Sequence, residues 1–337
     1  MRTTVRGTDR LAQLDVGQVR KFARGWRWHA RCDGYGAMTA PRQVLPGTIY
    51  LVTRRCSQRQ FLLRPSKLTN QTFGYLLAVA SARFRVEVHA FCVMSNHVHL
   101  VVTDPEGRLP AFSQFLDSLV ARAMNALLAR WEHFWGPSSY SAVALQSQSD
   151  VVDKIAYVLA NPVAAGLVRR GRMWPGSWSA PERMGAEPLE FSRPPRFFRK
   201  QGATALPERA RLDLVVPRGF VSPEEFRQLV SAALEVKEMT AAANLAARGR
   251  GFLGAKVALR QPPFGRPTRV EPRLGIKPRI ASRDTWRRIQ ALGQLVEFLR
   301  DYRRAFDAWR RGSTSVVFPA GTYLMRVLHG VPCKGPG

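Results

Sequence analysis

One stretch constrains the fold of this chain more than any other, the apolar run over residues 86–103. It contains two β-type segments that flank Ser95-Asn96, a pair of turn-forming residues, and so predicts an antiparallel hairpin whose second strand begins at His97. Side chains alternate between the two faces of a strand, so His97 and His99 are expected on one face and Val98 on the other. Two adjacent imidazoles can bind a metal ion. The same pattern also arises by chance, or as a hydrogen-bonded pair on a sheet surface.

The segment over residues 149–162 predicts an amphipathic helix. Ser149 or Asp150 can cap its N-terminus, and Pro162 would end it just after Asn161. Tyr157 and Asn161 are one turn apart and therefore share a face. A phenol one turn from an amide oxygen can serve both as a nucleophile and as the neighbour of a bound metal. The alternative is that Tyr157 only packs, as tyrosines on amphipathic helices usually do.

Four motifs in a fixed order resemble the single-tyrosine transposases of the HUH endonuclease superfamily, which include insertion-sequence and REP-associated tyrosine transposases. The two most specific are Met94-Ser-Asn-His-Val-His-Leu-Val-Val102 and Tyr157-Val-Leu-Ala-Asn-Pro-Val-Ala-Ala-Gly-Leu-Val168. Tyr50-Leu-Val-Thr-Arg-Arg-Cys-Ser-Gln-Arg-Gln60 resembles the first strand of the family, and Trp174-Pro-Gly-Ser-Trp-Ser179 resembles its closing segment. The resemblance ends near residue 180 and implies nothing about the rest of the chain.

The resemblance implies a specific chemistry. Tyr157 is the expected nucleophile, and His97, His99 and Asn161 are the expected metal ligands. Two imidazoles and one amide oxygen leave open positions that suit Mg²⁺ or Mn²⁺ with phosphate oxygens and water, whereas zinc is expected to prefer a closed site with thiolates. The expected reaction cleaves and rejoins DNA through a covalent 5′-phosphotyrosine. Its substrate would be single-stranded DNA, often with a hairpin nearby. The reaction would serve DNA transposition or the mobilisation of repeated elements.

Contacts to the DNA backbone are expected from Arg54, Arg55 and Arg59, which lie on or just after the first strand. The sequence departs from the family pattern in two places. Leu51 stands where a histidine is frequent, and Gly136-Pro-Ser-Ser139 replaces a segment that is usually richer in Gln and Arg. Both departures affect the expected substrate contacts more than the cleavage chemistry.

The charge of the chain favours a polyanionic partner. There are 52 Lys and Arg against 24 Asp and Glu, a formal net charge of +28, which favours nucleic acid. A GC-rich genome can explain why most of the cations are Arg, but not their excess over acids. The four cysteines have no Cys-x-x-Cys spacing, which argues against a zinc ribbon or disulfide scaffold and favours a reducing cytoplasm. No apolar run approaches the length of a membrane span, so no membrane partner is expected.

The order of predicted elements indicates an α+β fold, a ferredoxin-like antiparallel sheet with helices on one face. The expected elements are strands at about 48–55, 86–94, 97–103 and 140–145, and helices at about 67–84, 109–132 and 149–161. We expect a catalytic domain over 38–180, a Pro/Arg-rich linker over 181–220 and a mainly helical basic region over 221–337. The last region should contain helices at about 222–247 and 284–311. Residues 1–37 are either a basic arm that touches DNA or, if translation begins at Met38, not native.

Two other functions compete with a transposase. A non-catalytic nucleic-acid-binding protein that kept the fold would show the same charge and the same elements. A two-histidine phosphoesterase would need two similar His-x-Thr/Ser motifs, whereas this chain has a single His-x-His. The resemblance also leaves a homodimer open, because relatives that exchange the tyrosine helix between subunits are dimers and shorter REP-associated relatives need not be.

Overall fold

The computed structural model describes residues 40–137, 140–195, 198, 205–268 and 278–335. The chain divides into two compact units, a larger one over Pro46–Ala281 and a smaller one that joins the segment before Pro46 to residues 282 onwards. Residues 1–37, for which two origins are expected, lie outside the described residues. The larger unit contains all four of the motifs named above.

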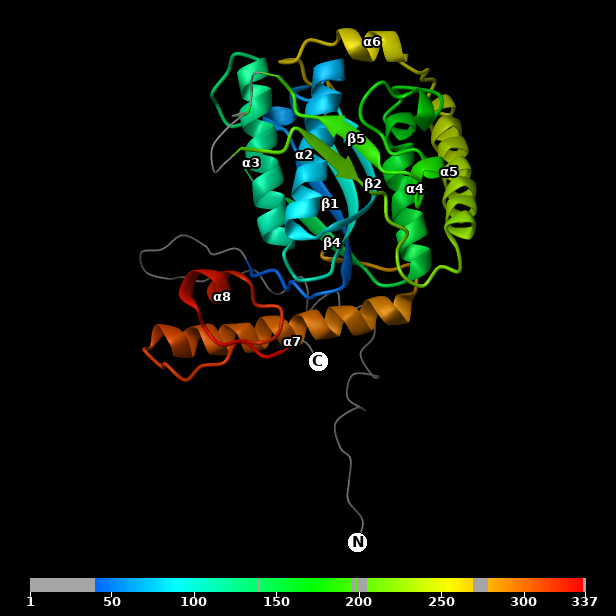
Figure 1. Cartoon of the computed structure of the whole chain (residues 1–337). Helices are drawn as coiled ribbons and strands as arrows, with labels where there is room; N and C mark the ends of the chain where they lie inside the picture. Colours follow the sequence, from blue (N-terminus) through cyan, green and yellow to red (C-terminus); the bar gives the residue numbers. More distant parts are fainter. Residues whose placement is uncertain (1–39, 138–139, 196–197, 199–204, 269–277, 336–337) are drawn as a thin grey trace. The chain divides into compact units, whose positions relative to one another are not determined.

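A five-stranded sheet forms the centre of the larger unit (Figure 1). The sheet order is β2-β3-β1-β4-β7, with bounds β1 Thr48–Arg55, β2 Glu87–Met94, β3 His97–Asp104, β4 Ser141–Leu145 and β7 Ile280–Ala281. All neighbouring strands are antiparallel except β4 and β7. The β2–β3 pair is the hairpin that the sequence predicts. Because β1 pairs with β3, Thr53 stands opposite His99 and Arg55 opposite His97.

Two helices, α2 (Lys67–Phe84) and α3 (Leu109–Leu127), cover one face of this sheet. Phe73 of α2 and Phe112 of α3 line the same small cavity as Val98 of β3. Both aromatic side chains are buried. The apolar residues that predict these helices therefore form the core beneath the sheet, where burial of large side chains contributes most to stability.

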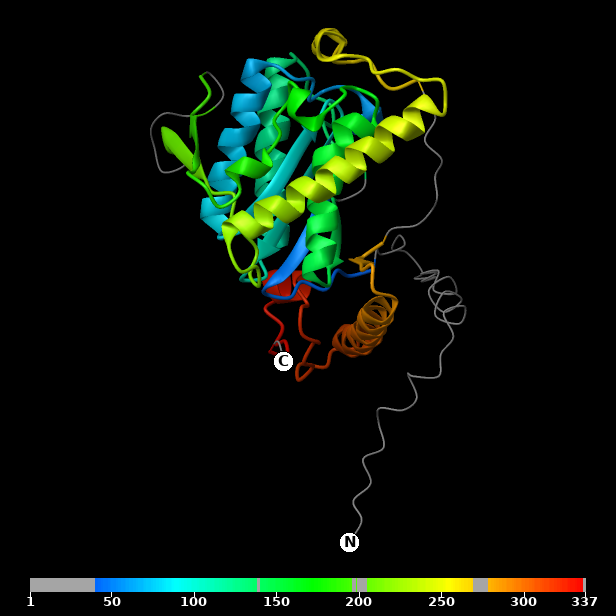
Figure 2. The ribbon, with the colours of Figure 1, turned by 90° about the vertical axis from the view of Figure 1, so that its right-hand side faces the viewer.

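The other face carries α4 (Gln148–Ala164), and α5 (Pro223–Ala246) packs against α4 (Figure 2). The ferredoxin-like α+β class is thus confirmed, with one addition to the prediction, because helices lie on two faces rather than one. The physical reason is that nearly every residue of β2 and β3 is buried. A sheet that is apolar on both faces needs a cover on each.

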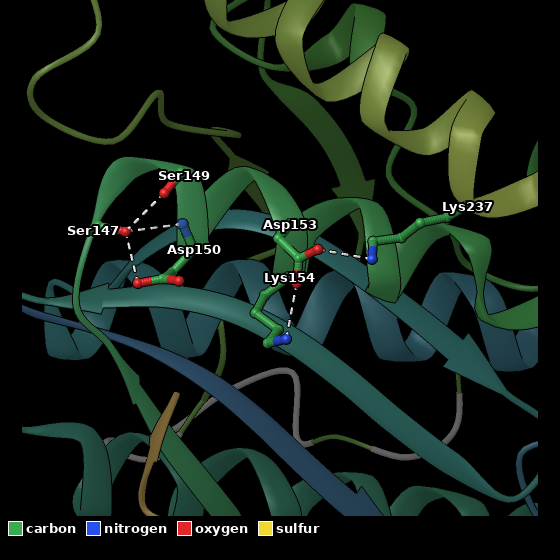
Figure 3. A network of polar contacts seen from close by, with 6 residues as sticks. All are labelled: Ser147, Ser149, Asp150, Asp153, Lys154 and Lys237. Atoms are coloured by element: carbon green, nitrogen blue, oxygen red, sulfur yellow. Dashed lines mark hydrogen bonds and ion pairs between the residues drawn. The ribbon is translucent and has the colours of Figure 1, made fainter. Parts of the chain in front are cut away.

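The first turn of α4 begins slightly earlier than predicted. The side chain of Ser147 accepts a hydrogen bond from the backbone N–H of Asp150 at 3.2 Å, so Ser147 is the capping residue in place of Ser149 or Asp150 (Figure 3). Ser147 is itself in an extended conformation, as N-cap residues are.

The last turn of α4 also differs from the prediction, because Pro162 lies inside the helix. The helix ends at Ala164 and Ala165 is its C-cap. Gly166 follows with a left-handed φ of 73°, and Leu167 donates its N–H to the carbonyl of Pro162 at 2.9 Å. This is a glycine-terminated helix end, which satisfies the last carbonyls. A proline this near the end removes little of the helical hydrogen bonding. Asn161 is therefore held within the helix and not at its end.

The segment expected to be a linker contains a β-hairpin. β5 (Leu189–Ser192) and β6 (Arg209–Leu212) pair antiparallel and lie against α2. Phe191 packs so closely on Gly74 of α2 that a Cβ at Gly74 would come within 2.2 Å of its ring. Strands of four residues among prolines and arginines give almost no periodicity, which is why the sequence did not predict them.

The smaller unit contains α7 (Thr285–Arg310) and α8 (Leu324–His329). α7 has nearly the predicted bounds, and Asp284 caps it by accepting the N–H of Arg287 at 3.0 Å. Phe298 and Tyr302 of α7 form a small core with Phe318. None of the helices in the described ranges is both long enough and apolar enough to cross a membrane.

The buried His89 of β2 gives the fold a predicted pH dependence. Its Nδ1 lies 2.6 Å from the carbonyl oxygen of Val215 and its Nε2 lies 2.7 Å from the hydroxyl of Thr103. Burial lowers the pKa of His89 to about 4. The unfolded chain takes up this proton near pH 6.5, so the free energy of unfolding should fall by about 3 kcal/mol as the pH drops from about 6.5 to about 4.

Urea unfolding across this pH range checks the prediction. A His89→Gln variant retains a neutral hydrogen-bonding side chain, so its stability should vary less with pH than that of the parent. An equally steep decline in the variant would show that another group is responsible.

Candidate active site

The two histidines of β3 lie side by side, as the alternation of the strand predicts. Their ring centroids are 4.7 Å apart and the ring planes meet at 86°. His99 is 5% exposed, whereas His97 is half-buried at the start of the strand. His99 contacts Tyr157 and Asn161 of α4, so both histidines lie on the α4 side of the sheet.

Each imidazole contacts a neighbouring oxygen through Nδ1. His99 Nδ1 lies 2.9 Å from Oγ1 of Thr53, and His97 Nδ1 lies 2.7 Å from Oδ1 of Asn96. When Nδ1 donates to these oxygens, the lone pair of each ring is on Nε2, and contacts of this kind orient imidazoles in metal sites. The sequence did not identify Thr53 or Asn96. For Thr53 the signal is its register opposite His99, which requires the strand pairing to be known.

The electrostatic environment keeps His99 neutral. Burial, with additional contributions from the neighbouring His97 and Arg55, holds the pKa of His99 well below 6.5. At pH 7 its ring is therefore uncharged, which is the form that binds a metal ion.

Tyr157 and Asn161 of α4 both reach the histidine pair. The ring centroid of Tyr157 is 5.7 Å from that of His99, and the side chain is 43% exposed. Asn161 Nδ2 lies 3.2 Å from His99 Nε2. The oxygen and nitrogen of an amide are assigned from hydrogen bonding, and rotation by half a turn exchanges them. After such a rotation Oδ1, in place of Nδ2, lies beside His99 Nε2. The four residues predicted as nucleophile and ligands thus form one cluster between β3 and α4.

The donor atoms of this cluster fit a divalent ion that keeps open coordination positions. Among the described residues there is no group of three or more His, Cys, Asp or Glu that could hold a metal. An ion at the histidine pair would therefore use His97, His99 and the amide oxygen of Asn161. Such a set leaves room for phosphate oxygens and water, as Mg²⁺ and Mn²⁺ require.

The helix that carries Tyr157 is fixed to α5 by a charged network (Figure 3). Asp153, one turn before Tyr157, has its carboxylate 2.9 Å from Nζ of Lys154 and 2.8 Å from Nζ of Lys237 on α5. Partial burial opposes ionisation, but the two ammonium groups outweigh it and hold the pKa of Asp153 below its usual value. This carboxylate is therefore a brace between two helices.

The three arginines predicted to contact DNA do not share a face. Arg54 lies on the α3 side of the sheet, where its Nε is 3.1 Å from Oδ2 of Asp117 and its guanidinium lies over Trp135 at 5.6 Å. Consecutive strand residues point to opposite faces, so Arg54, one of the three predicted DNA contacts, points away from the histidine pair. Arg55, which is exposed, stands on the histidine side, and Arg59 follows in the next loop. These two remain predicted contacts.

Arg54 should therefore matter for stability rather than for DNA affinity. An Arg54→Gln substitution leaves the largely buried carboxylate of Asp117 without its ion pair, and we expect a loss of about 1–3 kcal/mol in the free energy of unfolding. Urea unfolding measures this effect, and Arg55→Gln is the matched control. If Arg54→Gln weakens DNA binding as much as Arg55→Gln without destabilising the fold, the assignment of Arg54 is wrong.

The two departures from the family pattern also have defined places. Leu51 is almost fully buried in β1, opposite Val101, so no polar ligand is available at this position. Gly136 donates its N–H to the carbonyl of Arg55 at 2.8 Å, whereas residues 138 and 139 lie outside the described residues.

Comparison with known proteins points to one family. The family model described as "Transposase IS200 like" matches residues 48–158, which include His97, His99 and Tyr157. No curated protein matches the chain at a significant level.

Solved structures share parts of the fold at low similarity. A REP-associated tyrosine transposase bound to a REP hairpin is 18% identical, with 41% of this chain and 81% of that chain covered and a TM-score of 0.35. A candidate transposase from Deinococcus radiodurans is 20% identical, with 36% and 95% covered and a TM-score of 0.27. A tRNA(His) guanylyltransferase from Saccharomyces cerevisiae is 10% identical, with 45% and 67% covered and a TM-score of 0.28. At such TM-scores these likenesses add nothing to the fold described above.

The family match includes the first two motifs and Tyr157, the first residue of the third, and the histidine pair and the tyrosine lie in one cluster. Residues 48–158 of this chain match the model of the IS200-like transposase family, the family that the motifs resemble.

Proposed function

We propose that this chain is a transposase that cuts and rejoins single-stranded DNA through Tyr157, with a divalent metal held by His97, His99 and Asn161. The observation that supports this most directly is the cluster itself. A tyrosine on α4 and an imidazole on β3 have ring centroids 5.7 Å apart, and an amide from the same helix lies 3.2 Å from that imidazole. A tyrosine that only packs would not need a neutral imidazole, His99, and an amide, Asn161, beside it.

In the proposed reaction the phenolic oxygen of Tyr157 attacks the scissile phosphorus. A bond from this oxygen to phosphorus forms, the bond from phosphorus to the 3′-oxygen breaks, and the phenolic proton passes to solvent while the 3′-oxygen gains one. The protein keeps a 5′-phosphotyrosine. A second 3′-hydroxyl can attack this ester and release Tyr157, so strand joining needs no ATP.

A divalent ion, when bound, would neutralise charge that develops on the phosphate. The contribution of the chain is orientation. Thr53 and Asn96 hold the imidazoles, and the brace between Asp153 and Lys237 holds the tyrosine helix. Fixed placement of the reacting groups can itself account for several kcal/mol of a reaction barrier.

The substrate should be single-stranded DNA, with a hairpin nearby as a feature that the enzyme recognises. An unpaired strand can lay its phosphate against a site formed between a sheet and a helix, whereas a duplex presents both backbones on a rigid cylinder. Arg55 and Arg59 are the proposed backbone contacts near the histidines.

Incubation of the protein with end-labelled, hairpin-bearing single strands and Mg²⁺ or Mn²⁺ tests the proposal. We expect a protein–DNA adduct that survives denaturation and whose mass shift locates it on the peptide containing Tyr157. DNA binding without an adduct, across a randomised library of such substrates, would instead favour a non-catalytic binding protein that retains the fold.

A further inference from the structure

A basic segment after α5 has no place in the proposed reaction. Residues 247–268 contain five Arg or Lys and no Asp or Glu. This segment includes the short helix α6 (Ala255–Arg260), which lies beyond the end of α5 (yellow in Figures 1 and 2). We refer to residues 252–266 as the strap.

The first end of the strap is fixed to the turn that follows the tyrosine helix. Leu253 donates its N–H to the carbonyl of Gly166 at 2.8 Å, and Gly254 donates to Leu167 at 2.8 Å. Ala258 of α6 is completely buried against the core of the larger unit. The strap is therefore packed on the protein rather than extended into solvent.

The second end of the strap is fixed to the loop that follows β1. Phe61 donates its N–H to the carbonyl of Gly265 at 2.9 Å, and Arg64 Nη1 donates to the carbonyl of Gln261 at 3.2 Å. The same loop is bound to the turn before His97, since Asn96 Nδ2 donates to the carbonyl of Arg59 at 3.2 Å. The strap thus joins the turn after the tyrosine helix to the loop after β1, and that loop is itself bonded to the turn of the histidine hairpin.

One aromatic side chain of the strap is presented to solvent from an anchored backbone. Phe264 is 56% exposed. It lies in a tight turn closed by the N–H of Gly265 and the carbonyl of Pro262 at 2.9 Å, and its own carbonyl accepts from Gln60 at 3.4 Å. An exposed ring on a fixed backbone is suited to stack on an unpaired base at little entropic cost.

Three cations accompany this ring. Lys256, Arg260 and Arg266 are all exposed, and within the described part of the chain none of them has an ion-pair partner. Cations that are not neutralised by protein carboxylates can bind phosphates. Surfaces that bind single strands usually combine such cations with aromatic side chains.

We propose that the strap binds the single strand next to the phosphate that Tyr157 attacks, with one base stacked on Phe264 and the neighbouring phosphates held by Lys256, Arg260 and Arg266. The strap is bonded to the turn after the tyrosine helix and to the loop after β1, so a DNA strand bound there would continue towards the candidate active site. Single strands should be preferred over duplex, because the bases of a duplex are already stacked on one another. The position of the scissile phosphate in this inference rests on the proposed function, whereas the binding itself does not.

Fluorescence anisotropy with a labelled oligothymidine, measured on the full chain carrying Tyr157→Phe to prevent cleavage, tests the role of the ring. Phe264→Ala should weaken binding by about 5- to 100-fold, the range expected for the loss of one stacked base. Phe264→Tyr should restore affinity to near that of the parent, and a duplex of the same length should bind equally to all three proteins. An oligothymidine affinity that is unchanged in Phe264→Ala overturns the proposal.

The cations are tested by the salt dependence of the same binding. A triple variant with Gln at 256, 260 and 266 should lower the slope of log affinity against log salt by about 2, because each single-strand phosphate contact contributes about 0.7. The matched control replaces Arg122, Arg209 and Arg218 by Gln, which removes the same charge from exposed positions outside the strap. Equal slopes in the two triple variants would show that only net charge matters, and the strap would have no special role.

Adduct formation by proteins that retain Tyr157 separates this inference from the proposed function. An adduct in the parent, together with unchanged binding in Phe264→Ala, sustains the proposed function and refutes the strap. Weakened binding in Phe264→Ala, with no adduct in any protein, supports the strap as a binding site and refutes the proposed function.

Discussion

Replacement of Tyr157 by Phe should abolish the covalent adduct and lower the rate of strand cleavage by a factor of about 10⁴ or more, the order expected when a covalent nucleophile is removed. The substitution deletes a single oxygen and keeps the ring that contacts His99. The fold and the affinity for single-stranded DNA should therefore not change. Gel electrophoresis under denaturing conditions and anisotropy measure the two properties separately.

Tyr323→Phe is the matched control, since Tyr323 lies in the smaller unit and is also partly exposed. It should cleave like the parent. Residual adduct in the Tyr157→Phe protein would mean that another residue attacks the phosphate, and the assignment of the nucleophile would have to be abandoned.

Loss of a proposed metal ligand should have the second largest effect. We expect that EDTA prevents adduct formation, and that His99→Ala lowers the rate of cleavage by about 10²-fold or more at any concentration of Mg²⁺ or Mn²⁺, an effect comparable to the removal of a single charge-stabilising group. His99 is the proposed ligand that contacts both Asn161 and Tyr157, so its removal should disturb the proposed site most. Titration of the cleavage rate with metal measures the effect.

Thr53 provides a finer test of the same site. Thr53→Val removes the hydroxyl that contacts Nδ1 of His99 but keeps the shape of the side chain. We expect a 10- to 100-fold higher metal requirement, about the range for such orienting contacts, and a nearly normal rate at saturating metal. Thr48→Val, at the other end of β1, is the control and should have no effect.

The outcome that contradicts a metal site concerns His99 itself. Full activity of the His99→Ala protein in the presence of EDTA would exclude a metal ion at this position.

Residue patterns alone predicted most of the elements that form the candidate active site. The β2–β3 hairpin, the helical spacing of Tyr157 and Asn161, and the common face of His97 and His99 follow from local periodicity, which depends only on neighbours in the chain. The capping and proline signals predicted the two ends of α4 less well than periodicity predicted its faces. The sequence predicted that Pro162 ends the helix just after Asn161, whereas α4 continues to Ala164. Asn161, within hydrogen-bonding distance of His99, therefore lies inside the helix.

Contacts between residues far apart in the sequence were decided only by the tertiary structure. Strand pairing places Thr53 beside His99 and turns Arg54 away from it, and the packing of α5 on α4 brings Lys237 to Asp153. The four-residue strands β5 and β6 are stabilised by packing on α2 and not by their own periodicity. Local periodicity specifies which face of a strand or helix a side chain occupies. Which faces pack together depends on burial between residues far apart in the sequence, and a single sequence contains little information about those contacts.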